Sequence, residues 1–158
     1  MTMVRRRCVV CGKAAQAPIF LVESRGIPHG QPGHDVVYDY KLLFECARCL
    51  SGQLEVYSHD CWSHEDPWEM YWWYAFPPVA IDSVKHLGQV CSSPVTSSCE
   101  CSFHQFVRHE LRRVHSGIPY ARSAEDAKQY CWLRMGLDKH TNSPCITVDK
   151  SKAVGKVE

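Results

Sequence analysis

Residues 5–14 read RRRCVVCGKA and contain the first of two C-x-x-C pairs in this chain. The second pair is CARC, residues 46–49. A C-x-x-C pair in a tight turn points two sulfurs at one place, and two such turns complete a tetrahedron around zinc with metal–sulfur distances of about 2.3 Å. A thioredoxin-like dithiol would instead open a helix in a βαβ unit, which this sequence does not predict. The spacing therefore predicts one structural zinc site with four thiolate ligands: Cys8, Cys11, Cys46 and Cys49.

The residues around the two pairs have the composition of strands. APIFLVES (17–24), YDYKLLFEC (38–46) and GQLEVYSHD (52–60) are rich in β-branched and aromatic residues, and the third alternates apolar with polar positions. A Gly- and Pro-rich loop lies between the first two. Residues 8 to about 61 thus resemble a zinc ribbon, a family whose two cysteine turns sit on a small antiparallel sheet. The resemblance implies this architecture and a zinc ion, and it says little about function.

The rest of the chain predicts one more strand and then helices. WEMYWWYAF (68–76) is the most aromatic stretch and reads as a buried strand that ends at a double proline. Residues 78–88 repeat apolar side chains at helical spacing, and residues 102–117 form a stronger amphipathic pattern. Residues 123–136 begin with serine and acidic residues, which favours a third helix.

The expected fold class is therefore α+β, with a zinc-ribbon-like antiparallel sheet and a C-terminal helical part. We divide the chain into a zinc-ribbon-like lobe (1–66), an aromatic strand with helices packed on it (67–137) and an irregular tail (138–158).

A second group of possible metal ligands precedes the amphipathic helix. Three thiols and an imidazole close in sequence could wrap a second zinc ion, or they could form a cysteine-containing loop with a histidine near the helix cap, and the sequence leaves both open. Cys61 and His59 could add a ligand to either site, whereas Cys131 and Cys145 have no cysteine at C-x-x-C spacing and are expected to be ordinary thiols. The candidate ligands of the second site are Cys91, Cys99, Cys101 and His104.

Composition limits the classes of function. The 158 residues carry 18 basic and 17 acidic side chains and a formal charge of +1, which gives little nonspecific attraction for nucleic acid. No apolar run approaches the ~20 residues of a membrane span, and no signal peptide is evident. With ten cysteines in such a chain, we expect a cytoplasmic protein whose thiols bind metal.

No catalytic motif is recognised. HELRRVH places His109 and His115 six residues apart, whereas a metalloprotease helix needs its two histidines one turn apart on one face. A zinc ion with four thiolate ligands has no open position for water, so the chain is not expected to be an enzyme.

A binding function is the remaining expectation. Carboxylates beside aromatic side chains suit a basic protein partner. The whole layout also resembles small bacterial zinc-containing immunity proteins, and this resemblance implies a chain that neutralises a toxin domain. The alternative is a zinc-ribbon protein that binds nucleic acid or has a regulatory role. The predicted partner-binding residues are Asp60, Glu65, Asp66 and Glu69.

Overall fold

The computed structural model describes most of the chain, namely residues 7–14, 16–27, 36–60, 68–89, 91, 99–109, 121–122, 129–152 and 155–156. Its helices and strands follow in the order β1 (Gln16–Gly26), β2 (Val36–Cys46), β3 (Gly52–Asp60), β4 (Trp68–Phe76), α1 (Pro78–Gln89), α2 (Ser102–His109), β5 (Gln129–Leu137), β6 (Pro144–Val148) and β7 (Gly155–Lys156).

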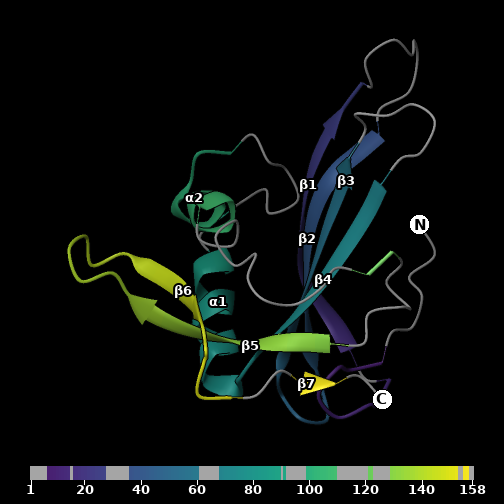
Figure 1. Ribbon diagram of the computed structural model, residues 1–158. Coiled ribbons are helices and arrows are strands. Elements are labelled where there is room, and N and C mark those ends of the chain that lie inside the picture. The colour runs from purple at the N-terminus through teal and green to yellow at the C-terminus, as the bar shows by residue number, and fades with distance from the viewer. Residues whose placement is uncertain are drawn as a thin grey trace.

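All of the strands belong to one mixed sheet of seven strands, in the order β1-β2-β3-β4-β5-β6, with β7 paired to β5. Strands β1 to β4 pair antiparallel in sequence order. Strand β5 then pairs parallel to β4, with Trp73 opposite Tyr130. Helices α1 and α2 lie in the crossover between these parallel strands and cover one face of the sheet (Figure 1). The β5–β6 hairpin runs across the lower part of the molecule and extends past α1 (Figure 1).

The main core lies between the sheet and the two helices. Alternate positions of the strands face the helices, because side chains of a strand point to opposite faces in turn. Helix α1 contributes Ala80, Ile81 and Val84, and α2 contributes a stripe that includes Phe103, whose ring meets Phe20 of β1 edge-on at 5.0 Å. The strand residues buried in this core are Phe20, Val22, Leu43, Leu54, Val56, Tyr74, Phe76, Cys131, Leu133 and Ile146.

The opposite face of the sheet is aromatic and contains one buried carboxylate. Glu55 of β3 is fully buried and accepts hydrogen bonds from the hydroxyl of Tyr40 and, at 3.2 Å, from Nε1 of Trp73. Trp73 also belongs to a second, smaller core cluster with Val9 and Tyr130. Residues 73–76 of β4 are therefore buried on both faces of the sheet, which suits a strand with aromatic side chains at six of its nine positions.

Five predicted elements are confirmed: the strands that became β1 to β4 and the helix that became α1. The helix predicted over 102–117 begins at Ser102 as α2 and is described to His109, and its remainder lies outside the described residues.

The predicted fold class is wrong, because the described residues are mostly strand and include no C-terminal helical part. Part of the predicted third helix is β5. Its residues bury alternately on the two faces: Tyr130 lies on the aromatic face, whereas Cys131 and Leu133 lie in the main core. The acidic start of this segment favoured a helix, but its aromatic and apolar residues fill both sides of a sheet. Strands β6 and β7 follow within 138–158.

No helix in the described part of the chain has the length and apolar character needed to cross a membrane.

Candidate metal centres

The first C-x-x-C pair lies in a tight turn ahead of β1. The amide of Cys8 donates to the carbonyl of Lys13 at 2.9 Å, and the amide of Gly12 donates to the carbonyl of Cys8 at 2.9 Å. Gly12 has a φ of 70°, in the left-handed region that glycine adopts without a steric penalty. These two hydrogen bonds reverse the chain and leave the sulfurs of Cys8 and Cys11 on the same side of the turn.

The second pair lies in a turn with the same hydrogen bonds, between β2 and β3. The amide of Cys46 donates to the carbonyl of Ser51 at 3.0 Å, and the amide of Leu50 donates to the carbonyl of Cys46 at 2.9 Å. Leu50 occupies the position of Gly12 and is also left-handed, with a φ of 59°. The amide of Arg48 points at the sulfur of Cys46, 3.4 Å away. The two pairs are therefore carried by two equivalent turns, here called the cysteine turns.

The four sulfurs of the cysteine turns converge at one end of the sheet. The Sγ atoms of Cys8 and Cys49 are 3.7 Å apart, and those of Cys11 and Cys46 are also 3.7 Å apart. All four atoms lie within 4.8 Å of one another. A tetrahedral shell with metal–sulfur distances of about 2.3 Å places its sulfurs about 3.8 Å apart, so the residues fit a metal ion of this coordination. The group could hold a metal ion and is compatible with a zinc ribbon.

A third turn shows how the same backbone closes without thiols. Between β5 and β6 the amide of Asp138 donates to the carbonyl of Ser143, the amide of Asn142 donates to the carbonyl of Asp138, both at 2.9 Å, and Asn142 has a φ of 54°. Asp138 and Thr141 stand where the cysteine turns carry their two thiols. The carboxylate of Asp138 accepts from the amides of His140 and Thr141 and from the hydroxyl of Thr141. The side chains of this turn form hydrogen bonds within the turn itself. The sulfurs of the cysteine turns instead lie together, where they could share one ligand.

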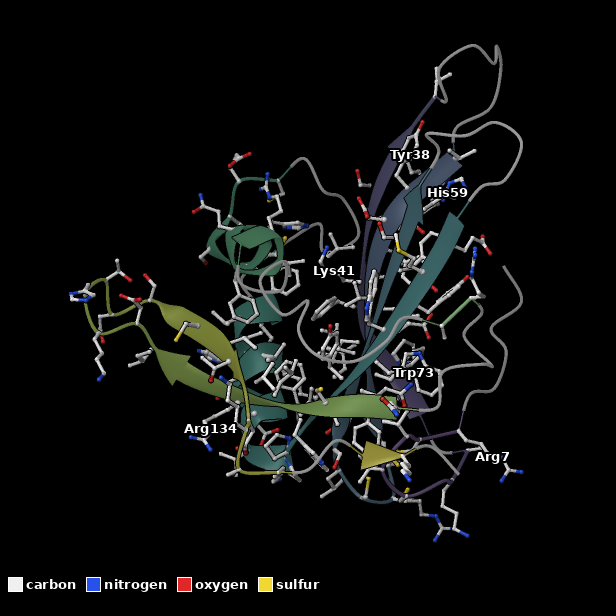
Figure 2. All side chains as sticks on the ribbon, viewed as in Figure 1. Arg7, Tyr38, Lys41, His59, Trp73 and Arg134 are labelled. Carbon is white, nitrogen blue, oxygen red and sulfur yellow. The ribbon has the colours of Figure 1, made fainter. Side chains whose placement is uncertain are left out.

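The environment of the first cluster divides its thiols into two kinds. Burial raises the pKa of Cys8 to about 12. Burial also opposes ionisation of Cys49, but hydrogen bonds from Ser51 and from neighbouring sulfurs outweigh it and lower the pKa of Cys49 to about 7. Zinc with four thiolates carries a charge of about −2, and exposed basic residues lie in or beside both turns: Arg7, Lys13 and Arg48. Figure 2 shows Arg7 at this end of the molecule.

Strands β5 and β7 adjoin the first cluster. Tyr130 belongs to the same buried cluster as Val9 of the first cysteine turn, and burial, followed by the charges of Cys8 and Cys49, raises the pKa of its hydroxyl. A Cβ at Gly155 would lie 2.0 Å from Cζ of Tyr130. The backbone of β7 therefore packs directly on the Tyr130 ring, next to the cysteine turns.

The second cluster lies in the helical layer. Cys91 follows α1, where its amide donates to the carbonyl of Gly88 at 3.2 Å. Cys99 and Cys101 precede α2, and His104 lies in the first turn of that helix. The ligands therefore come from the end of α1, from the segment before α2 and from the first turn of α2, all within the crossover between β4 and β5.

The second set of donors also fits a metal ion. The Nδ1 atom of His104 is 3.4 Å from the sulfur of Cys91 and 3.3 Å from that of Cys101, and the sulfurs of Cys91 and Cys99 are 4.0 Å apart. Sulfur and nitrogen ligands of one tetrahedral zinc ion lie about 3.5 Å apart. His104 is fully buried, and a buried ring nitrogen is costly unless it is engaged; a metal ion bound here would engage Nδ1. The structure thus favours the metal-site interpretation that the sequence left open, and this group could also hold a metal ion.

Cys101 is an acidic thiol at the start of α2. The amide of His104, together with its imidazole, lowers the pKa of Cys101 to about 6. The amide nitrogen lies 3.5 Å from the sulfur and belongs to the first turn of α2, where backbone N–H groups attract a negative charge. Cys101 is therefore ready to bind a cation as a thiolate near neutral pH.

The other predicted residues are not brought together in the same way. Glu69 lies exposed on β4, and Asp60 ends β3. Glu65, Asp66 and Cys61 lie outside the described residues. The two cysteines expected to be ordinary thiols, Cys131 in the main core and Cys145 on β6, belong to neither metal group.

No protein-family model matches this chain, and comparisons with curated proteins and with solved structures find no match either.

Proposed function

We propose that this chain is a zinc-stabilised protein-binding module without catalytic activity of its own. The observation that supports the proposal most is the ligand count, because each cluster brings together four cysteine or histidine donors at tetrahedral spacing. Thiolate and imidazole donors in this geometry favour zinc over calcium or magnesium, which require oxygen ligands. A shell of four protein ligands leaves no position for water or substrate, which is typical of a structural site.

The aromatic face of the sheet is the proposed binding surface. At the end remote from the cysteine turns, His59 of β3 lies opposite Glu69 of β4 in the strand register. The Tyr38 ring stacks on His59, with ring centroids 6.4 Å apart (Figure 2). In the next row the ring of Tyr57 lies between those of Tyr40 and Tyr71, 4.8 and 5.0 Å away. We call the half-buried or exposed part of this surface the aromatic end; it comprises Tyr38, His59, Glu69 and Tyr71.

The aromatic end has the composition of a protein interface. Tyrosine is enriched at such interfaces because it provides a large contact area and a polar tip. Glu69 accepts a hydrogen bond from Tyr57 at 3.1 Å, which holds an exposed carboxylate in a fixed place between rings. A fixed carboxylate attracts a basic side chain and steers a basic partner. In sequence, the acidic segment with Glu65 and Asp66 connects the two strands that carry His59 and Glu69.

The partner that we propose is a basic protein. Toxin neutralisation, which the resemblance in layout implies, is one specific form of this function: a nucleic-acid-degrading toxin domain is basic and would be occluded by an acidic surface. Nucleic acid itself is a poorer partner, because a chain with a net charge of +1 releases few counterions on binding.

A binding experiment with charge-reversed variants tests this proposal. Glu69→Lys should strongly weaken the recovery of a basic protein from the source cells. Asp82→Lys is the matched control, because Asp82 is an exposed carboxylate on α1, in the layer on the other side of the sheet. Equal recovery by both variants would contradict the assigned surface. If the wild type recovers only RNA or DNA, and binding is lost at about 0.5 M salt, the nucleic-acid alternative is correct.

A further inference from the structure

Arg108 of α2 contacts two of the three segments that carry the ligands of the second cluster. Its Nε atom donates to the carbonyl of His104 at 3.3 Å, and one terminal nitrogen donates to the carbonyl of Cys99. The other terminal nitrogen pairs with the carboxylate of Glu100 at 3.1 Å. One guanidinium therefore joins the helix to the segment that precedes it.

The second cluster needs such a connection more than the first. In each cysteine turn, both thiols lie within one hydrogen-bonded loop that their own backbone closes. The second set is drawn from the end of α1, from residues 99–101 and from the first turn of α2. Cys99 reaches the site ahead of the helix, and the described contacts of its carbonyl are with Arg108.

The negative charge of a zinc-loaded site also favours a cationic side chain beside it. Zinc with three thiolates and one neutral imidazole carries a net charge of about −1, and this charge lies in a half-buried place where solvent screens it poorly. The Arg108 guanidinium is half-buried beside it. The planar fork of arginine can bridge several oxygen acceptors in fixed directions, which the single ammonium of lysine cannot do.

We propose that Arg108 is the positioning residue of the second metal site: it holds the Cys99–Cys101 segment against α2 so that three thiolates meet the imidazole of His104. The inference rests on the proposed second zinc ion. Arg108 does not coordinate the metal; it acts through the residues that do. Loss of a contact that orients metal ligands typically lowers metal affinity about 10- to 100-fold.

The test compares three variants of the full chain loaded with zinc: Arg108→Ala, Arg108→Lys and Arg134→Ala. Arg134 is the matched control, because it forms an exposed ion pair with Asp149 at 2.9 Å on β5, away from either cluster. Zinc is withdrawn by a chromophoric chelator while native mass spectrometry counts the ions that remain. Replacement of zinc by Co²⁺ adds a spectroscopic measure of tetrahedral geometry at each site.

Arg108→Ala should lower the affinity of one ion about 10- to 100-fold and leave the other unchanged. The zinc affinity of Arg108→Lys at this site should lie between that of Arg108→Ala and that of the wild type. The affinities of Arg134→Ala should equal those of the wild type. The proposal is overturned if Arg108→Ala holds both ions as the wild type does, or if it releases both equally with a general loss of folding. A wild type that binds a single ion would refute the second site itself, and that result is visible before any variant is made.

Discussion

The substitutions Gly12→Ala and Gly136→Ala should change the stability of this protein in opposite directions. Gly12 closes the first cysteine turn with a φ of 70°, and no atom lies within 4 Å of a Cβ added there. The effect of alanine is therefore almost purely conformational. The left-handed region costs an L-residue about 1–2 kcal/mol, and the less flexible unfolded chain returns about 0.4–1 kcal/mol. Gly12→Ala should lower the free energy of unfolding by about 1 kcal/mol.

Gly136 provides the control. It lies in β5, and a Cβ there would meet only the sulfur of Cys145, at an ordinary contact distance of 3.8 Å. Strand backbone suits alanine, so Gly136→Ala should raise the free energy of unfolding by about 0.4–1 kcal/mol through the unfolded state. Equilibrium unfolding in urea with zinc present measures both variants under the same conditions. Equal stability of the two variants would refute the assignment of a left-handed closing residue to the first cysteine turn.

Three further results are expected. Gly155→Ala should lower the melting temperature and loosen the first metal site, because the added methyl overlaps the Tyr130 ring; an unchanged melting temperature would show that β7 does not pack there. Phe103→Ala should cost about 3–5 kcal/mol in chemical denaturation, because this side chain is fully buried, and a cost under about 1 kcal/mol would exclude α2 from the core. In metal-stripped protein, the His104 amide lowers the Cys101 pKa to about 6 from its ordinary value of 9.0. This thiolate therefore contributes its full stabilisation of the folded state above pH 9, and the stabilisation is lost as the pH falls through about 6. Thiolate absorbance should show a step near pH 6 in the wild type that is absent from Cys101→Ser, whereas the step of Cys49 near pH 7 should remain in both.

The first candidate metal site could be predicted from sequence because its geometry is local. A C-x-x-C pair fixes two sulfurs within one turn, and the only long-range requirement is that two turns meet. Strands β1 to β3 place them together, since β1 follows the first turn and β2 leads directly into the second. The third turn, at Asp138, has no sequence signature in common with the cysteine turns. The three turns share a left-handed residue four positions after their first residue, and this residue is glycine, leucine or asparagine.

The helical interpretation failed for residues 129–136 because local signals favour a helix while the partners of this segment are far away in sequence. Tyr130 and Trp132 find their neighbours on β4, and Leu133 finds its neighbours in the helical core. The position of Arg108 in an amphipathic helix likewise does not predict its contacts. Its acceptors include the carbonyl of Cys99, which no periodic pattern of side chains can reveal.

Native mass spectrometry of the purified, reduced protein tests the central claim most directly. If both clusters are structural zinc sites, the folded chain carries two zinc ions. Cys11→Ser, in the first cluster, and Cys91→Ser, in the second, should then each lower occupancy at one site and leave the other filled. A folded wild type that carries no zinc, with its thiols reduced, would contradict the account.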